Sequence, residues 1–224
     1  MRGGAARRFV AGMPSLRQLL TAHAPLLVID AASAQLQVGR LRAEGSSEWQ
    51  TSGEEAGIGV FACLEKLEGR PADFGAWLFC DGPGSVLGIR TVAMALRTWD
   101  VLAPRPVFAY HSLALVAHAL GNNDISVIAD ARRDAWHHYR LGGTLRRVPA
   151  AELAGELVMP ENFRHWSALP AGVTRVPYPL AELLPRVIDA ELFRQTDAPD
   201  AFLHEEPSYV TWTPKIHRAP APKP

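Results

Sequence analysis

One pattern occurs twice in this chain, and it limits the possible folds more than any other feature. An apolar run ends in an aspartate at Leu26–Asp30 and again, about one hundred residues later, at Ile125–Asp130. Such runs are typical of strands that are buried on both faces. A segment of alternating apolar and polar residues follows each run, at 34–41 and at 135–141, as expected for a pairing strand. The repeat indicates an internal duplication.

The segments between the repeats predict an α/β protein. Apolar spacing predicts helices over 14–22, with Ser15 as N-cap, and over 53–67, 85–101, 112–120 and 180–193. Apolar runs at 76–80 and 106–110 predict further buried strands. Two halves of this kind suggest the duplicated actin-like (ribonuclease-H-like, ASKHA) architecture. The second half fits less closely, because 146–176 is rich in proline and glycine.

The predicted organisation has four parts. Residues 1–25 form a leader with a short helix, 26–110 the first half, 111–212 the second half, and 213–224 a disordered Pro-rich tail. The arginine-containing leader also makes Met13 a predicted alternative translation start. The interpretation as a cytoplasmic protein rests on two cysteines, expected to be reduced, and on the lack of a signal-peptide pattern or a membrane-length apolar run.

The balanced net charge argues against binding of nucleic-acid phosphates as the main function of this chain. Lys plus Arg and Asp plus Glu are equal at 23 each. A protein that grips a nucleic acid by its phosphates usually has a basic excess. We therefore expect any contact with a nucleic acid to be indirect.

The glycine-rich segment 82–90 is the most informative motif. It reads Gly-Pro-Gly-Ser-Val-Leu-Gly-Ile-Arg and lies between a predicted strand and a predicted helix. Glycines allow close approach of a ligand, and a helix N-terminus favours an anion, so the turn could hold a phosphate. It is not a P-loop, because it lacks the Gly-Lys-Ser/Thr sequence. The alternative interpretation is a strand-to-helix turn that Ser85 caps.

The two aspartates also allow two interpretations. In actin-like kinases and ATPases, acids at these strand ends position Mg²⁺ and the attacking water, and Asp30 and Asp130 would be that pair. An acid after a buried strand is also a common turn residue. Arg132 and Arg133 could clamp a phosphate or a partner's carboxylate, or form a solvated hairpin end. The histidine spacings do not predict a metal site.

Four segments, in order, resemble landmarks of the TsaB (YeaZ) family. Asp-Ala-Ala-Ser at 30–33 stands where the family has D-T-S-T, and 82–90 resembles its G-R-G-P-G-S-F-T-G-[LI]-R loop. Asp-Ala-Arg-Arg at 130–133 resembles D-A-R-[RM], and Pro-Ser-Tyr-Val at 207–210 resembles the closing P-x-Y-[LV]-R. The chain departs from these patterns at 80–81 and 86–87, at Asp134, where glycine is usual, and at 52–55, where His-Ser commonly opens a helix.

The resemblance implies a role without an active site of its own. Members of the family are non-catalytic subunits that bind and activate TsaD, the subunit that makes threonylcarbamoyladenosine next to the anticodon of tRNA, and an ATPase, TsaE, joins them. No intrinsic cofactor is implied. ATP or ADP would bind at a subunit interface, and the candidate residues on this chain are Gly82, Pro83, Gly84, Ser85, Arg90, Asp30, Asp130, Arg132 and Arg133.

In the family, the first helix mediates pairing. The resemblance therefore makes the helix over 53–67 the predicted interface, through Ile58, Phe61, Ala62, Leu64 and Leu67. Either a TsaD-like subunit or a second copy of this chain could use it. Two other hypotheses remain at this stage: a small ATPase or kinase that uses the aspartates and the Gly-rich loop, and a homodimeric structural paralogue that does not bind TsaD.

Overall fold

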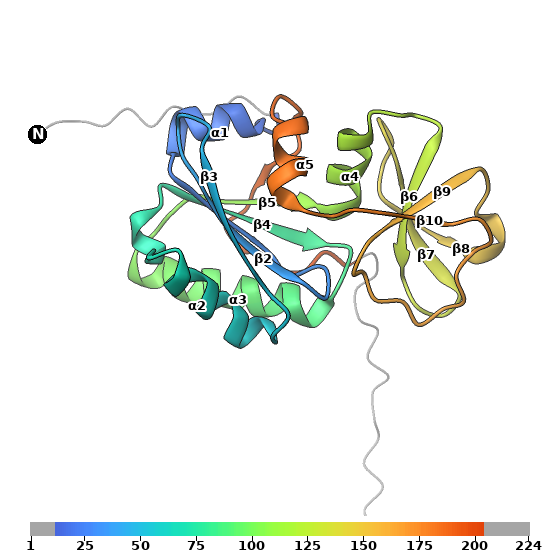
Figure 1. The fold of residues 1–224 in the computed structure, drawn as a ribbon, viewed down its shortest axis with the longest axis horizontal. Helices are drawn as coiled ribbons and strands as arrows, with labels where there is room; N and C mark the ends of the chain where they lie inside the picture. Colours follow the sequence, from blue (N-terminus) through green and yellow to red (C-terminus); the bar gives the residue numbers. More distant parts are fainter. Residues whose placement is uncertain (1–11, 204–224) are drawn as a thin grey trace, which may run out of the picture.

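A computed structural model describes residues 12–203, which form two β-sheets with helices packed on them (Figure 1). In chain order the elements are α1 (Leu16–His23), β1 (Leu26–Asp30), β2 (Leu36–Leu41), β3 (Ser47–Ser52), α2 (Ala56–Lys66), η1 (Pro71–Asp73), β4 (Ala76–Gly82), α3 (Val86–Leu102), β5 (Val107–His111), α4 (Ser112–Leu120), β6 (Ile125–Asp130), β7 (Ala135–Arg140), β8 (Arg146–Pro149), η2 (Ala150–Glu152), β9 (Glu156–Pro160), β10 (Thr174–Val176), α5 (Leu180–Arg186) and β11 (Arg194–Gln195).

The two sheets confirm the duplication. The first has the order β11-β5-β4-β1-β2-β3, and the second has the order β10-β9-β6-β7-β8. In each sheet the strand that ends in aspartate is central, pairs antiparallel with the next strand, and pairs parallel with the third strand after it. Asp30 and Asp130 therefore occupy equivalent strand ends.

The halves differ in the helices that join their strands. In the first half α2 follows β3 and α3 follows β4, whereas in the second half the short 3₁₀ turn η2 follows β8 and an irregular segment, 161–173, follows β9. Pro149, Pro160, Pro170 and Gly172 interrupt helical hydrogen bonding there. The sequence analysis did not predict β8, β9 or β10.

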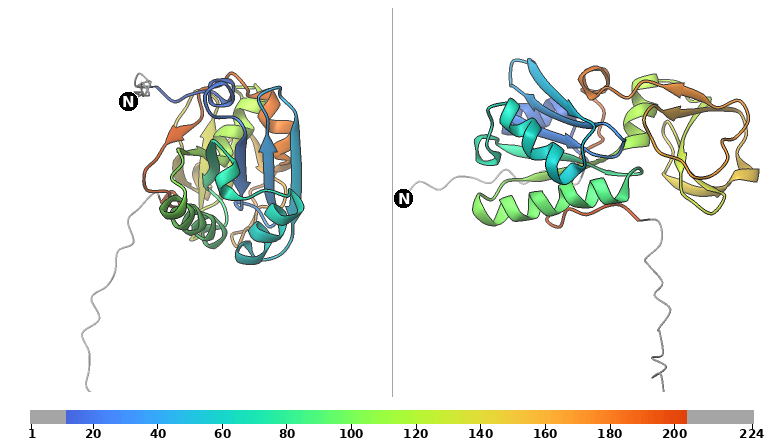
Figure 2. Two further views of the ribbon diagram at one scale, coloured as in Figure 1. Left: turned by 90° about the vertical axis from the view of Figure 1, so that its left-hand side faces the viewer. Right: turned by 60° about the horizontal axis from the view of Figure 1, so that its bottom comes forward.

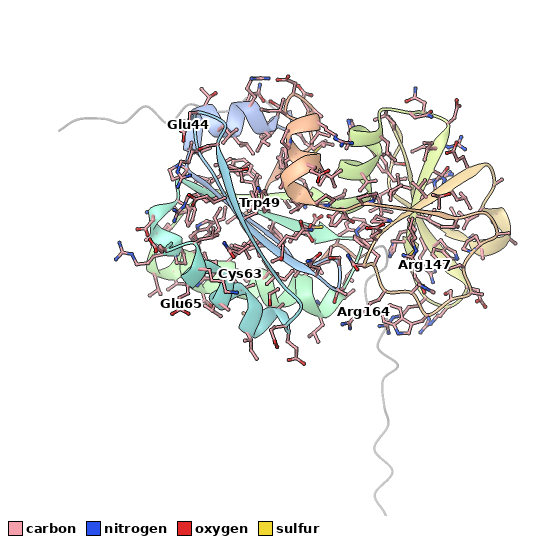
Figure 3. All side chains as sticks on the ribbon, in the orientation of Figure 1. Glu44, Trp49, Cys63, Glu65, Arg147 and Arg164 are labelled. Atoms are coloured by element: carbon pink, nitrogen blue, oxygen red, sulfur yellow. The ribbon has the colours of Figure 1, made fainter. Side chains whose placement is uncertain are left out.

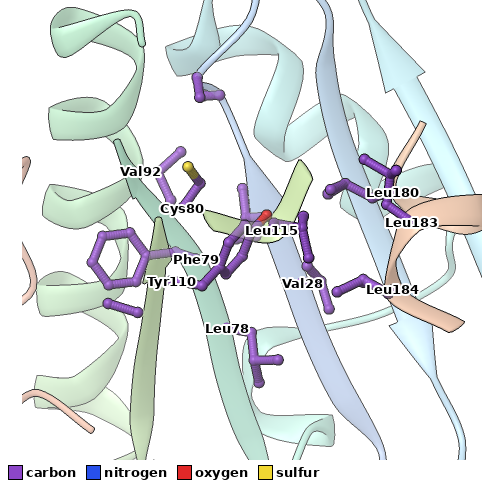
Figure 4. Close-up of a cluster of buried hydrophobic side chains, with 14 of the residues drawn as sticks. Val28, Leu78, Phe79, Cys80, Val92, Tyr110, Leu115, Leu180, Leu183 and Leu184 are labelled. Carbon is purple, nitrogen blue, oxygen red and sulfur yellow. The ribbon is translucent and has the colours of Figure 1, made fainter. Parts of the chain in front are cut away.

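The helices cover both faces of the first sheet. Figures 1 and 2 show α2 and α3 side by side on one face, with α1 and α5 on the other. Helix α4 contacts strands of both sheets and also packs on α5. In Figure 4 the leucines of α5 and Leu115 of α4 meet Val28 from one side of the sheet, and Val92 of α3 lies on the other side.

The end of the described chain returns to the first sheet. Helix α5 ends at Arg186, seven residues before the predicted end at 193, and Pro185 lies in its last turn. The chain then adds β11 antiparallel to β5, and Ser15 bridges to Glu191. The predicted second half, 111–212, thus contributes a strand to the first sheet. The predicted tail, 213–224, and the motif at 207–210 lie outside the described residues.

Three local features of the chain also bear on the sequence predictions: the N-cap of α1, the two cysteines and the hydropathy of the helices. Ser15 caps α1, with a capping box to Gln18. Cys63 and Cys80 are both buried and free. Between residues 12 and 203, no helix has the length and hydropathy needed to cross a membrane.

Candidate functional site: an interlobe cleft and an apolar helix face

The Gly-rich turn is bound to the rest of the protein by its own backbone. Ser85 caps α3 by accepting a hydrogen bond from the Gly88 N–H (3.4 Å), and its own N–H donates to the Ala32 carbonyl (2.7 Å). The Ser112 hydroxyl donates to the Pro83 carbonyl (2.6 Å). The turn is therefore a capped strand-to-helix connection tied to the end of β1 and the start of α4.

Two glycines of this turn are needed for packing. A Cβ on Gly84 would collide with the Ala32 carbonyl, and a Cβ on Gly88 would lie 2.6 Å from the Ala31 carbonyl. The start of α3 thus approaches the end of β1 too closely for any side chain at these positions.

The packing around Gly88 and Gly57 predicts that replacing each glycine by alanine will change the free energy of unfolding in opposite directions. We expect Gly88→Ala to lower the free energy of unfolding by about 1–3 kcal/mol, because the new methyl group overlaps backbone atoms. Gly57→Ala in α2 meets only the Thr91 methyl, at 3.9 Å, and should raise it by about 0.5–1 kcal/mol. Urea unfolding measures both variants, and equal signs would contradict the packing.

Asp30 lies at the centre of a buried hydrogen-bond network. Its side chain is fully buried, and one carboxylate oxygen accepts the hydroxyls of Tyr110 and Tyr178, each at 2.7 Å. The other oxygen accepts the Ala32 N–H at 2.9 Å. Burial raises the pKa of Asp30, and hydrogen bonds from Tyr178, Ala32, Tyr110 and Cys80 oppose that rise. Tyr178 follows β10, so this carboxyl group joins the two halves.

Asp130 is held differently at the equivalent strand end. Its oxygens accept the backbone N–H groups of Arg132, Trp166 and Ser167, and the Ser167 hydroxyl at 3.2 Å. Burial raises the pKa of Asp130, but the backbone hydrogen bonds outweigh it, so the pKa lies below the ordinary carboxyl value. Asp130 therefore fixes the β6–β7 turn and the 161–173 segment.

This lowered pKa predicts a pH dependence. The stabilisation from ionised Asp130 is complete above the ordinary carboxyl pKa of 3.8 and is lost as the pH falls through the lower, folded-state value. We expect the stability difference between wild type and Asp130→Asn to be largest above pH 5 and to shrink below about pH 4. Chemical unfolding across this range measures it, and a difference that does not change with pH would contradict the assignment.

The β6–β7 turn has an unusual backbone. Arg132, Arg133 and Asp134 all have positive φ, at 59°, 54° and 53°. Glycine adopts this conformation most readily, which gives a physical reason for glycine at the position of Asp134 in the resembled pattern. The Arg132 guanidinium lies 4.4 Å from the centre of the Trp166 ring.

A polar cleft opens between the halves next to the Gly-rich turn. It has a volume of about 340 Å³, and its lining includes Ser33, Glu54, Ser85, Gly88 and Arg164. Figure 3 shows Arg164 at the junction of the two halves. Of the predicted nucleotide residues, only Ser85 lines this cleft. Asp30 is fully buried, and neither it nor Asp130, Arg132 or Arg133 is part of the lining of the cleft.

An apolar groove runs between α2 and α3. Its volume is about 450 Å³, and its lining includes Val60, Phe61, Arg90, Met94 and Trp99. Beside or along it several large apolar side chains are exposed: Ile58 (62%), Phe61 (54%), Leu87 (80%), Met94 (60%) and Val101 (84%). We call these five residues, together with the groove, the α2–α3 face.

The α2–α3 face corrects the predicted interface. Of the predicted interface residues, Ile58 and Phe61 are exposed and Ala62 is half-buried. Leu64 and Leu67 are buried in the core at 4% exposure each, so they cannot contact a partner. Arg90 belongs to this groove, where it forms a long ion pair (3.6 Å) with Asp200.

Sequence analysis missed one polar cluster beside the turn. Asp81 is buried at 2% exposure, and its carboxylate contacts His111 Nδ1 at 2.7 Å and the Arg194 guanidinium at 2.9 Å. His111 lies at the end of β5 and precedes α4, and its ring packs edge-on against Phe202. The only sequence signal for this cluster was that residues 80–81 depart from the Gly-Arg of the resembled family loop. Within the described residues no group of His, Cys, Asp or Glu could hold a metal ion.

Comparisons with known proteins give the fold. The sequence matches no family model and no curated protein. Similar solved structures include an uncharacterised protein with similarity to peptidase YeaZ from Pseudomonas aeruginosa (TM-score 0.53, 20% identity, 72% of this chain and 88% of that chain) and YeaZ from Pseudomonas aeruginosa (TM-score 0.52, 21% identity, 71% and 88%). This chain therefore has the duplicated actin-like α/β fold of these YeaZ structures.

Proposed function

We propose that this chain is a divergent protein of the TsaB (YeaZ) type, a non-catalytic cytoplasmic subunit. It binds and activates a TsaD-like subunit in the synthesis of threonylcarbamoyladenosine in tRNA. The observation that carries the proposal is the α2–α3 face, which exposes Ile58, Phe61 and Met94 on a fold shared with YeaZ. Large apolar side chains gathered around a groove mark a protein-binding surface.

The composition of the α2–α3 face fits a helix-mediated interface. Phe61 packs edge-to-face on Trp99 at 6.1 Å between ring centres, so an aromatic anchor is already held in position. Arg90 and Thr98 lie within the groove and provide polar groups. An apolar centre with a few polar groups is the usual anatomy of a specific interface.

The polar cleft supports the nucleotide part of the proposal. Arg164 and the Ser85-capped start of α3 would meet ATP or ADP there when a TsaD-like subunit or a TsaE-like ATPase completes the site. Among residues 12–203, no lysine lines this cleft. Nucleotide binding is thus assigned to the complex, with no cofactor intrinsic to this chain.

The competing kinase or ATPase hypothesis has less support. Both oxygens of Asp30 already accept hydrogen bonds from the protein, and Asp130 accepts three backbone N–H groups. A carboxylate that positions Mg²⁺ and water needs free oxygen lone pairs in an open site. A homodimer without TsaD remains the second candidate, because the same α2–α3 face could bind another copy.

A reconstituted transfer reaction tests the proposed function. A TsaD-like subunit from the same organism is supplied with threonylcarbamoyl-adenylate and tRNA, with and without this chain. We expect modification of tRNA only when the chain is present, and none with the chain alone. Equal modification without the chain would overturn the proposed role.

A further inference from the structure

Most arginines between residues 132 and 175 differ from the other described arginines in their partners. Outside 132–175, every arginine between residues 12 and 203 except Arg105 forms an ion pair with a carboxylate; Arg105 donates instead to backbone carbonyls. Within 132–175 no ion pair to a described residue is formed by Arg132, Arg133, Arg140, Arg146, Arg164 or Arg175. The balanced net charge therefore hides a local cationic surface.

The β7–β8 hairpin concentrates this charge. From 135 to 151 the chain contains arginines and histidines but no Asp or Glu. His138 is the register partner of Arg146, and Arg140 lies two residues further along β7, so the three side chains share one face. Burial lowers the pKa of His138, and the neighbouring charges of Arg146 and Arg140 lower it further.

The arrangement favours an extended anion over a single small one. Ser126 is fully buried, and its hydroxyl holds Arg140 (3.0 Å) and contacts His138 Nε2 (3.0 Å), which fixes one end of the surface. Arg133 lies at the other end, in the β6–β7 turn, separated from the His138–Arg146 pair by about 10–15 Å of strand. Phosphates about two nucleotides apart on an extended strand can meet charges spaced in this way.

An aromatic platform lies at the Arg133 end. Trp166 is 62% exposed, and Arg132 stacks on its ring. Asp130 holds the backbone at Trp166 and Ser167, so the ring is presented from a fixed segment. Stacking on exposed aromatic rings and arginine planes is how proteins hold unpaired bases, whereas an acidic peptide has no need of such a ring.

We propose that the β7–β8 hairpin with Trp166 is a binding surface for single-stranded or looped RNA. Arg133, Arg140 and Arg146 contact phosphates, and Trp166 stacks on a base. The acids nearest to this surface are Asp130, whose oxygens accept hydrogen bonds from Arg132, Trp166 and Ser167, Asp134 beside Arg133 in the turn, Glu152 in η2, and Glu156 and Glu161 at the two ends of β9. The inference does not depend on the proposed TsaD-like partner, because the isolated chain carries the whole surface.

The test measures binding of the full chain to a fluorescent single-stranded RNA of about 15 nucleotides at about 50–200 mM salt. The test variant is Arg133→Gln with Arg146→Gln, because neither side chain makes a hydrogen bond or ion pair with a described residue. We expect about tenfold weaker binding at low salt and a salt slope smaller by about 1.4. The matched control is Arg42→Gln with Arg70→Gln, which removes equal charge from exposed ion pairs. It should change neither the affinity for RNA nor the salt slope.

Trp166→Ala separates RNA from other polyanions. It should weaken RNA binding at least about fivefold through lost stacking and leave binding of a polyglutamate peptide or of anionic lipid vesicles unchanged. Equal losses in the test and control arginine pairs would overturn the proposal. So would RNA binding that Trp166→Ala does not weaken, or polyglutamate or vesicles binding as tightly as RNA. Thermal unfolding checks that each variant is folded.

Discussion

Phe61→Glu is expected to weaken binding of a TsaD-like subunit by at least about 100-fold, which corresponds to about 2.7 kcal/mol. Phe61 is half exposed beside the α2–α3 groove, where a partner would bury it. A central aromatic residue commonly contributes 2 kcal/mol or more to an interface, and a buried glutamate adds an unpaired charge. Titration calorimetry with the purified subunits measures the change.

The stability of the variant itself should change much less. Within the chain Phe61 loses its edge-to-face contact with Trp99, which is worth about 0.5–1.5 kcal/mol. Leu169→Glu is the matched control, since Leu169 is similarly exposed (43%) but lies in the second half of the chain. Equal loss of binding in both variants, or no loss in Phe61→Glu, would contradict the assignment of this face.

Asp30→Ala is expected to lower the free energy of unfolding by about 3–5 kcal/mol. Removing the carboxylate leaves the Tyr110 and Tyr178 hydroxyls and the Ala32 N–H without an acceptor in a buried site, and each such group costs about 1–3 kcal/mol. Asp30→Asn keeps polar atoms in the same place and should cost less than half as much. Urea unfolding measures both.

An exposed aspartate provides the control for this comparison. Asp197→Ala should stay within about 0.5 kcal/mol of wild type, because Asp197 is exposed and makes no hydrogen bond or ion pair with a described residue.

A catalytic role predicts the opposite pattern for Asp30: loss of ATP turnover with little change in stability. That outcome would favour the ATPase hypothesis.

Most of the first half was predictable because its signals are local. The apolar runs at 26–30 and 76–80 and the helical spacing at 85–101 each predict an element without knowledge of the rest of the chain. The short strands β8, β9 and β10 give no such signal, since they lie among prolines and glycines. Strand β11 has two residues and exists only because β5 offers an edge.

The interface residues show why a helix pattern is not enough. Helix α2 is apolar around most of its circumference, so the sequence does not tell which face meets the sheet. The structure buries Val60, Leu64 and Leu67 and exposes Ile58 and Phe61. The exposed apolar side chains of α3 were missed for the same reason.

The buried polar network could not be predicted for another reason. Asp30 meets Tyr178, which lies 148 positions away in the sequence. No periodicity links such residues, and only the packing of one half on the other brings them together. The same is true of Asp81 and Arg194, which are 113 positions apart.

The most direct test of the central claim is size-exclusion chromatography of the purified chain with a TsaD-like subunit from the same organism. The account predicts that the two co-elute as a complex, and that Phe61→Glu separates them while Leu169→Glu does not. A homodimer of this chain that excludes the TsaD-like subunit would contradict it.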